Sequence, residues 1–453
     1  MKREAIQELE QWKARADRKP LLLLGARQVG KTWLMQEFGR VSYRNTAYVR
    51  FDTKPQIREI FEQGADIPRL LAAIQYEVGF RPEPGETLIV FDEIQECPAA
   101  LTSLKYFCEE APEYHVIAAG SQLGIRSTWG SGFPVGKVDF MRLYPMCFTE
   151  FLEATGYARL AELLHAGDMA MVTAFRTDLE EQLRRYYYVG GMPEAVRKYA
   201  ESGDFSQARK EHERLLASYE MDFGKHVPKE LLARVQLLWK SIPGQLAREN
   251  KKFVCSAVGQ NVRMRELQEP LEWLRNAGLI EMVPRVKVPS IPLSAYEDGA
   301  FKVFFLDVGL LGAKSGLDLS VLLDRTRVFR EFKGALAEQF VQQELRAVCG
   351  IKPSYWSSPR SDAEIDFLFQ HGMDVLPVEV KAETNLRAKS LKQFCQQHQP
   401  SKAVRCSLSP FHRQVVPFQQ PKGDATAYEL LDLPLYALCR LRQSLPHAVE
   451  SVT

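Results

Sequence analysis

Short apolar runs alternate with amphipathic helical stretches over residues 1–150 of the chain. The pattern predicts strands at 21–25, 47–52, 87–92, 114–121 and 138–144, with helices between them. Two of these helices begin at a proline, Pro55 and Pro98, where the missing N–H costs nothing because the first helical turn offers it no acceptor. Such alternation is typical of a parallel sheet covered by helices on both faces. We therefore predict an α/β domain over residues 1–150.

The pattern becomes helical from 147 to 223, interrupted by the turn Gly190-Gly191-Met192-Pro193, which predicts a helical lid subdomain over residues 151–228. Residues 229–302 then show two helices, a turn, a third helix at 264–276 and a strand at 279–283. A proline-bearing loop and a strand at 302–306 follow. This order predicts a winged helix-turn-helix over residues 229–318.

The last part of the chain begins with a long predicted helix at 331–348. Strands are predicted at 354–356, 363–369 and 375–381, followed by a helix, a strand and a closing helix. We interpret residues 319–453 as a second α/β domain with its own core. A chain of 453 residues is too long for one ordinary hydrophobic core, which agrees with several domains.

Composition narrows the class of protein. Apolar residues at 45% and charged residues at 26% are near the averages for folded domains, which excludes disordered, collagen-like and coiled-coil chains. No apolar run approaches the roughly 20 residues that cross a bilayer, and the charged start lacks the apolar segment of a secretory signal. The eight cysteines are scattered, so we expect reduced, mostly buried thiols. A cytoplasmic protein without a membrane partner is predicted, and the net charge of +2 neither indicates nor excludes nucleic-acid binding.

The segment G-A-R-Q-V-G-K-T at 25–32 follows a predicted strand and opens a predicted helix, the context that a P-loop requires. Its glycines let successive N–H groups turn toward one anion at a helix N-terminus. We expect Lys31 to reach the β- and γ-phosphates of ATP and Thr32 to bind Mg²⁺. The expected nucleotide-contacting residues are Gly25, Ala26, Arg27, Gln28, Val29, Gly30, Lys31, Thr32 and Trp33.

An acidic pair, Asp92-Glu93, ends the apolar run at 88–91 and is expected at the end of a neighbouring strand. Asp92 would hold Mg²⁺ through water, and Glu93 would orient and deprotonate the attacking water. Ser121, after the following strand, is the candidate sensor of the γ-phosphate, although a serine in an ordinary turn fits the same pattern.

Phosphoryl transfer is helped by an additional cation, often supplied by a neighbouring subunit. The candidates here are Arg126, Lys137 and Arg142, each of which also fits an ordinary solvated charge. ATPases with such a cation in trans usually form symmetric assemblies, so a homo-oligomer is compatible with the sequence.

A second group of chemically active residues lies in the last domain. Glu338 is in a predicted helix, Asp366 is in the strand E-I-D-F-L-F, and Glu379-Val380-Lys381 ends the next apolar strand. Because side chains alternate along a strand, Glu379 and Lys381 share one face. Glu338, Asp366 and Glu379 could hold a second Mg²⁺ or a Mn²⁺, with Lys381 positioning water. A structural salt bridge is the alternative explanation.

Basic residues also mark the predicted winged helix. They are Arg263, Arg265, Arg275, Arg285 and Lys287. Such residues can contact the phosphates of DNA or RNA. Winged helices also serve as joints or as contacts to other proteins, so both kinds of partner remain open.

Several long segments are distinctive in sequence. They are L-L-L-L-G-A-R-Q-V-G-K-T, F-D-E-I-Q-E-C-P-A-A-L-T-S-L-K-Y-F-C-E, A-A-G-S-Q-L-G, F-P-V-G-K-V, L-Y-P-M-C-F-T-E-F-L, Y-V-G-G-M-P-E-A-V and V-E-V-K. Through them the chain resembles, over nearly its whole length, bacterial and archaeal P-loop ATPases of the AAA+ superfamily. Members of that family carry a C-terminal domain of unknown function that is related to restriction endonucleases.

The resemblance implies an AAA+-like P-loop sheet with ATP and Mg²⁺ as cofactors, and a C-terminal fold of the PD-(D/E)XK type. Glu338, Asp366, Glu379 and Lys381 match the nuclease motif. Many members carry arginine where this chain has Lys137, and lysine lacks the planar fork of an arginine finger.

Two functional hypotheses remain. In the first, ATP hydrolysis gates a metal-dependent nuclease that acts on nucleic acid, for example in defence against foreign DNA. In the second, the protein is a nucleotide-dependent switch or scaffold whose C-terminal part binds a nucleic acid or a protein without cleaving it.

Overall fold

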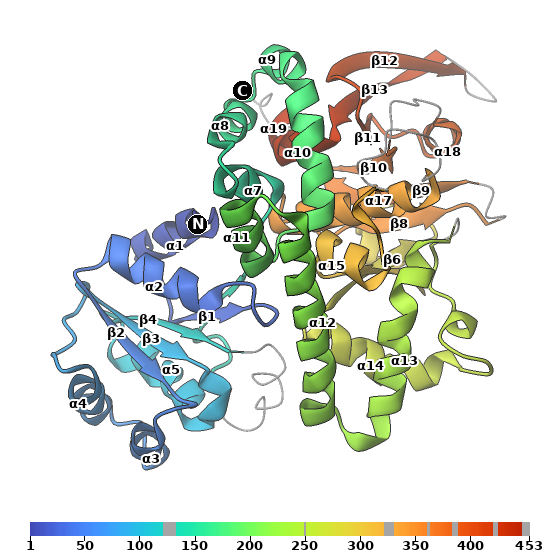
Figure 1. Ribbon diagram of the computed structural model, residues 1–453. Helices are drawn as coiled ribbons and strands as arrows, with labels where there is room; N and C mark the ends of the chain where they lie inside the picture. Colours follow the sequence, from blue (N-terminus) through green and yellow to red (C-terminus); the bar gives the residue numbers. More distant parts are fainter. Residues whose placement is uncertain are drawn as a thin grey trace. The chain divides into compact units, whose positions relative to one another are not determined.

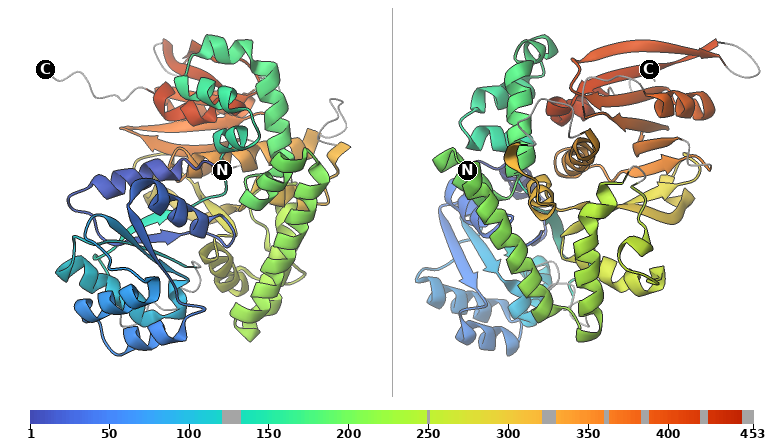
Figure 2. Two further views of the ribbon diagram at one scale, coloured as in Figure 1. Left: turned by 60° about the vertical axis from the view of Figure 1, so that its left-hand side comes forward. Right: turned by 45° about the vertical axis from the view of Figure 1, so that its right-hand side comes forward.

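The computed structural model describes residues 1–120, 133–248, 251–320, 330–359, 363–382, 388–419 and 425–445. The chain divides into two compact units. The N-terminal unit comprises Lys2–Pro145 together with Asn276–Leu279, and the C-terminal unit comprises Met146–Arg275 and Ile280–Thr453. Figures 1 and 2 show the elements of both units.

The N-terminal unit contains a five-stranded sheet in the order β2-β3-β4-β1-β5, with every neighbouring pair parallel. Its strands are β1 (Leu21–Leu24), β2 (Asn45–Arg50), β3 (Thr87–Asp92), β4 (His115–Ala119) and β5 (Asp139–Arg142). Its helices are α1 (Ala5–Ala14), α2 (Lys31–Ser42), α3 (Pro55–Glu62), α4 (Ile67–Val78), η1 (Ile94–Glu96) and α5 (Pro98–Glu110). The five predicted strands and the two helix starts at proline are confirmed.

Strand order corrects one expectation. The strand that ends in Asp92 was expected to neighbour the strand before the P-loop, but β4 lies between β1 and β3. The carboxyl end of β4 carries small residues, with Ala118 beside Phe91 and Ala119 beside Leu23, and Gly120 follows. Small side chains at this edge leave room for Asp92 to reach across the intervening strand.

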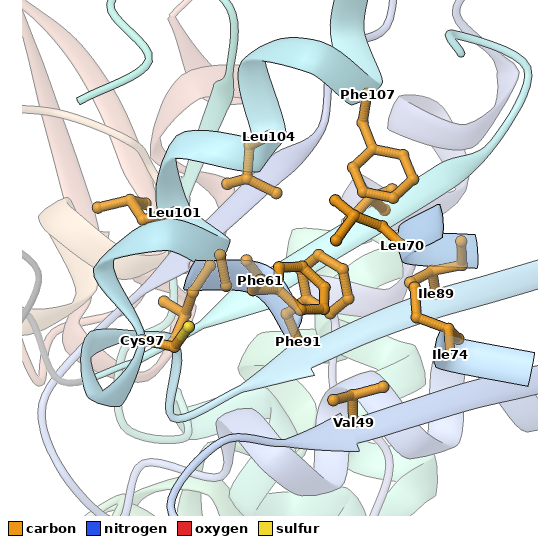
Figure 3. Close-up of a cluster of buried hydrophobic side chains, with 14 of the residues drawn as sticks. Val49, Phe61, Leu70, Ile74, Ile89, Phe91, Cys97, Leu101, Leu104 and Phe107 are labelled. Carbon is orange, nitrogen blue, oxygen red and sulfur yellow. The ribbon is translucent and has the colours of Figure 1, made fainter. Parts of the chain in front are cut away.

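Helices cover both faces of this sheet, with α1 and α2 along one face and α3, α4 and α5 along the other (Figure 1). The second face holds a core in which Phe61, Phe91 and Phe107 are each no more than 2% exposed. Figure 3 shows these rings together with Leu70 and Leu104. Edge-to-face contacts, such as Phe61–Phe91 at a centroid distance of 5.5 Å, fix β3 against α3. The acidic pair therefore follows a rigidly packed strand.

The C-terminal unit begins with helices, as predicted. They are α7 (Phe148–Ala154), α8 (Ala158–Ala166), α9 (Met169–Ala174), α10 (Arg176–Val189), α11 (Pro193–Ser202), α12 (Phe205–His226), α13 (Lys229–Leu246), η2 (Cys255–Ala257) and α14 (Met264–Asn276). Later helices are η3 (Leu293–Tyr296), α15 (Val308–Lys314), α17 (Arg330–Ala347), α18 (Lys389–His398), η5 (Leu435–Arg440) and α19 (Leu441–Ser444).

One mixed eight-stranded sheet runs through the rest of this unit, in the order β12-β13-β11-β10-β9-β8-β6-β7. Its strands are β6 (Ile280–Val286), β7 (Glu297–Phe305), β8 (Ser354–Ser357), β9 (Glu364–His371), β10 (Asp374–Val380), β11 (Lys402–Ser407), β12 (His412–Gln419) and β13 (Ala425–Pro434). Helix α17 packs against β7 and β10, and α18 packs against β9 (Figure 2).

The hairpin β6–β7 is part of this sheet, because β6 pairs in parallel with β8. The sequence assigned this hairpin to a winged helix and placed the following domain at 319–453. The sheet extends across residue 319, so β7 contributes side chains to the neighbourhood of β9 and β10. This topology decides which residues surround the C-terminal carboxylates.

The predicted turn at Gly190-Gly191 is held by a buried carboxylate. Asp307 accepts hydrogen bonds from the backbone N–H groups of Gly191 at 2.6 Å and Leu310 at 3.0 Å, which also caps α15. A Cβ on Gly190 would lie 2.2 Å from an Asp307 oxygen, and one on Gly191 would lie 2.1 Å from the carbonyl oxygen of Met146. Only glycine permits both approaches.

All eight cysteines are free thiols, and five of them are buried, as expected. Within the described ranges, no helix has both the length and the apolar character needed to cross a membrane.

Candidate nucleotide site and C-terminal carboxylate cluster

The P-loop joins β1 to α2 with the backbone shape of an anion nest. Gln28 and Gly30 have positive φ angles of 65° and 95°, and Gly30 is the N-cap of α2. Gly25 has φ of 156°, and a Cβ there would lie 2.5 Å from the carbonyl oxygen of Leu143. Alternating left-handed residues at a helix N-terminus direct N–H groups toward a bound anion.

Lys31 contacts the loop itself. Its ammonium group donates to the carbonyl oxygens of Gly25 at 3.0 Å and Ala26 at 2.8 Å. Burial lowers the pKa of Lys31 to about 8, an effect that the carboxylates of Glu93 and Asp92 partly oppose. The ammonium is thus already held in the loop, close to the place where phosphate oxygens would lie.

The predicted magnesium ligands converge. The hydroxyl of Thr32 donates to Asp92 at 2.8 Å, although the two residues lie 60 positions apart. The phenol of Tyr48, on β2, donates to the same carboxylate oxygen at 2.5 Å. A hydroxyl and a carboxylate are hard oxygen donors that suit Mg²⁺ beside a phosphate. Thr32 and Asp92 are therefore the residues that would hold a magnesium ion here.

Glu93 has an unusual backbone. It adopts a left-handed conformation with φ of 52° and ψ of 44°, directly before η1. Its side chain accepts a hydrogen bond from the amide of Gln95 at 2.5 Å, and its backbone N–H donates to Asp92 at 3.0 Å. A left-handed conformation is strained for a residue other than glycine, and such strain is found most often at functional sites.

Two residues that hold the nucleotide site in place, Arg3 and Tyr48, were not predicted from the sequence. Arg3 is 5% exposed and donates to the carbonyl oxygens of Val29, inside the P-loop, at 2.9 Å and of Tyr144 at 2.7 Å. Tyr48 fixes Asp92, as described above. A lone arginine near the start of a charged segment gives no signal in the sequence. Tyr48 could have been suspected, since it lies on a short strand of the same sheet.

Other predicted residues are placed as follows. Ser121 and Arg126 lie outside the described residues. Lys137 forms an ion pair with Glu109 of α5 at 2.8 Å, and Arg142 lies over the ring of Tyr144 at 5.3 Å. Trp33 is 39% exposed on the first turn of α2. The role of each in nucleotide binding or hydrolysis stays a prediction.

The structure also brings the C-terminal residues together. Asp366 accepts a hydrogen bond from the backbone N–H of Val380 at 2.8 Å, which fixes β9 to the end of β10. The ammonium of Lys381 lies 2.5 Å from a carboxylate oxygen of Glu379, as expected for two residues on one face. With Glu338 on α17 and Glu364 on β9, these residues form a group that we call the carboxylate cluster (Glu338, Glu364, Asp366 and Glu379).

Two lysines missed by the sequence analysis enter the carboxylate cluster. Lys302, on β7, has a fully buried side chain whose nitrogen lies 2.5 Å from Glu364, 3.7 Å from Glu338 and 3.9 Å from Asp366. Lys251 pairs with the other oxygen of Glu338. The charged residue in the apolar run F-K-V-F-F was a signal for Lys302, but the expected domain boundary separated it from the carboxylates.

The pKa values reflect this environment. Burial, with the neighbouring carboxylates Glu338 and Glu379, holds the pKa of Asp366 well above its usual value. Burial acts to lower the pKa of Lys302, but Glu364, Glu338 and Asp366 outweigh it and raise that pKa. Relative to water, this environment thus favours the protonated form of Asp366 and the charged form of Lys302.

The carboxylate cluster does not fit the second metal that the nuclease motif implies. An ammonium nitrogen already lies among three of its four carboxylates. In the described part of the chain, no group of three or more His, Cys, Asp or Glu side chains is arranged to hold a metal ion.

The basic residues of the predicted winged helix differ in exposure. Arg263, Arg265, Arg275 and Lys287 are exposed. Arg285 instead forms an ion pair with Asp298 at 2.6 Å and a hydrogen bond to Ser357 at 3.1 Å. It is thus engaged within the sheet.

Three segments match known protein families. Residues 17–152 match the family described as AAA domain, residues 180–320 match a domain of unknown function (DUF8612), and residues 333–421 match another (DUF4143). No curated protein matches the chain.

Solved structures with partial similarity include a Walker-type ATPase of Pyrococcus abyssi, with 17% identity over 69% of this chain and 94% of that chain and a TM-score of 0.41. The Orc1 protein of Aeropyrum pernix, solved in complex with DNA, has 14% identity over 69% and 91%, with a TM-score of 0.27. The RuvB branch migration motor of Thermotoga maritima has 16% identity over 63% and 90%, with a TM-score of 0.27. These TM-scores are too low to establish a common fold.

The family match covers the segment that carries the P-loop, the Thr32–Asp92 pair and Glu93. Residues 17–152 thus match the AAA domain and carry the geometry of a P-loop nucleotide site, and the two matched segments that follow them, 180–320 and 333–421, belong to domains of unknown function.

Proposed function

We propose that the protein is a nucleotide-dependent switch, in which hydrolysis of ATP in the N-terminal unit controls a C-terminal part that binds a partner without cleaving it. The convergence of Lys31, Thr32, Asp92 and Glu93 supports the hydrolytic half of this proposal. The proposal that the C-terminal part does not cleave its partner is supported by the lysines beside the carboxylate cluster, because these lysines already form ion pairs with its carboxylates.

In the proposed reaction, the P-loop N–H groups and the ammonium of Lys31 bind the β- and γ-phosphates of ATP. Thr32 and Asp92 would hold Mg²⁺, which supplies positive charge beside the phosphates. Glu93 orients a water molecule and accepts its proton as the water oxygen bonds to the γ-phosphorus. The bond from that phosphorus to the bridging oxygen of ADP breaks at the same time. Tyr48 and Arg3 act as positioning residues for Asp92 and the loop.

Replacing Glu93 by glutamine tests the hydrolytic step. We expect ATP to bind with unchanged affinity, because the P-loop contacts stay, while kcat falls by roughly 10²- to 10⁴-fold through loss of the base. Phosphate release and equilibrium binding of ATP with Mg²⁺ measure the two effects. Glu96→Gln is the matched control, since Glu96 is an exposed glutamate on η1, the short helix that follows Glu93. Equal hydrolysis by the Glu93 and Glu96 variants would show that another group is the base.

Cleavage of nucleic acid by the C-terminal part is the competing hypothesis. Purified protein should leave DNA and RNA intact with Mg²⁺ or Mn²⁺, both with and without ATP, because the predicted metal ligands Glu338, Asp366 and Glu379 are paired with lysines. Gel analysis of plasmid DNA and of a structured RNA measures this. Cleavage by the wild-type protein that disappears in the Asp366→Asn variant would restore the nuclease hypothesis.

The partner in this proposal is DNA, RNA or a protein. The exposed arginines Arg263, Arg265 and Arg275 are the candidate contacts to nucleic-acid phosphates.

A further inference from the structure

Nearly as many lysine ammonium groups as carboxylates lie at the carboxylate cluster. Four carboxylates (Glu338, Glu364, Asp366 and Glu379) face three lysines (Lys251, Lys302 and Lys381). A buried group of carboxylates without counter-charge would be strongly destabilising, and nucleases use divalent metal ions as that counter-charge. Here the chain provides the positive charge from its own side chains.

Lys302 is at the centre of this arrangement. Its side chain is fully buried, its nitrogen is within 4 Å of three carboxylates, and it lies 4.9 Å from the centroid of the Tyr355 ring. These contacts arise from α17, β8 and β9, so the ammonium is enclosed by three elements.

A divalent ion would meet two obstacles in the same place. Carboxylate oxygens bind Mg²⁺ at about 2.1 Å, but here they are arranged around a nitrogen at ion-pair distances of 2.5 to 3.9 Å. A divalent ion entering beside Lys302 and Lys251 would also be repelled by two positive charges in a medium of low dielectric constant.

We infer that the ammonium of Lys302, supported by Lys251, takes the place of a divalent metal ion in the carboxylate cluster, so that the cluster is a permanently occupied, metal-independent site. Its ion pairs hold β7, through Lys302, against the carboxylates of α17 and β9. The inference concerns this cluster alone and holds whether or not the P-loop hydrolyses ATP.

Binding of Mn²⁺ to the full-length, nucleotide-free protein tests the inference. Free Mn²⁺ can be followed by electron paramagnetic resonance during a titration. We expect the wild-type protein and the Asp366→Asn variant to retain equal amounts of Mn²⁺, because Asp366 is not available as a metal ligand. A stoichiometric Mn²⁺ site in the wild-type protein that Asp366→Asn removes would overturn the inference, whatever the behaviour of any lysine variant.

The Lys302→Met variant provides the complementary test. Methionine keeps much of the side-chain volume but removes the charge, so the carboxylates should gain one saturable Mn²⁺ site that the double variant Lys302→Met/Asp366→Asn lacks. Mn²⁺ at 100 times its Kd should then raise the Tm of Lys302→Met by roughly 5 °C and leave that of the wild-type protein unchanged. A folded Lys302→Met protein that gains no Mn²⁺ site would contradict the inference.

Lys314→Met is the matched control. Lys314 is 12% exposed and pairs with Glu220 at 3.3 Å, so it is another lysine of the same unit with a largely buried side chain and a carboxylate partner. It contacts one carboxylate rather than three, and its replacement should create no Mn²⁺ site. ATP hydrolysis, measured on the same samples, reports separately on the P-loop.

Discussion

Replacing Lys31 by alanine is expected to weaken the binding of ATP with Mg²⁺ on the order of 100-fold or more. The ammonium lies within the P-loop, where it donates to the carbonyl oxygens of Gly25 and Ala26. Phosphate oxygens entering the loop would become its new partners. Its removal leaves those phosphate charges unpaired in a largely desolvated place, which is why the expected loss is large.

Calorimetric titration of the nucleotide-free protein measures this change. Lys54→Ala is the control, because Lys54 is an exposed lysine of the same unit that pairs with Glu77 at 2.9 Å, and such pairs contribute little. The Lys31 and Glu93 variants should separate two steps, since the first loses binding and the second loses hydrolysis. An unchanged Kd for Lys31→Ala would mean that the nucleotide binds elsewhere.

Replacing Asp307 by alanine should destabilise the C-terminal unit by about 3 kcal/mol at neutral pH. The change leaves the N–H groups of Gly191 and Leu310 buried without their acceptor and removes the cap of α15. A buried N–H donor without an acceptor lowers the free energy of unfolding by more than an average hydrogen bond raises it. Thermal unfolding followed by circular dichroism measures the loss, and Asp318→Ala is the control, because the exposed side chain of Asp318 forms its hydrogen bonds with nearby Ser320 among the described residues.

The same carboxylate gives stability a specific dependence on pH. Burial raises the pKa of Asp307 to about 6 in the folded protein, although four nearby hydrogen-bond donors oppose this shift. The unfolded chain titrates near pH 4, so between these values the folded protein binds more protons. The pH-dependent part of the stability that this group contributes is thus fully present below pH 4 and is lost as the pH rises through 6, by about 3 kcal/mol, while its hydrogen bonds to Gly191 and Leu310 remain.

Asp307→Asn isolates this contribution, because asparagine keeps the shape but does not titrate. The stability of the wild-type protein relative to the Asn variant should fall between pH 4 and pH 7. A difference that stays constant over this range would show that Asp307 remains ionised throughout.

The sequence predicted the strand, loop and helix around residues 25–32 well because their signals are local. The P-loop needs glycine at positions 25 and 30 and a helix after them, and all of this lies within one short segment. Asp92 was recognised by the apolar run before it, but its strand was placed next to β1. Strand order depends on pairing between distant segments, and no local pattern encodes that β4 inserts between them.

The C-terminal cluster shows the opposite case. Glu338, Asp366, Glu379 and Lys381 were found from their spacing, and the structure brings them together. The residue that changes their chemistry, Lys302, comes from a hairpin that sequence order assigned to another domain. Pairing of β6 with β8 carries Lys302 to this place, and such non-local pairing is invisible to patterns of period 2 or 3.6.

The continuous sheet also determines where the chain can be divided. A fragment that starts at residue 319 would lack β6 and β7, so β8 would become an unpaired edge strand of the kind that promotes aggregation. It would also lack Lys251 and Lys302, leaving Glu338 and Asp366 to repel each other. A soluble fragment made this way would bind divalent ions as a substitute for the lost lysines, and its metal dependence would be a product of the cut rather than a property of the protein.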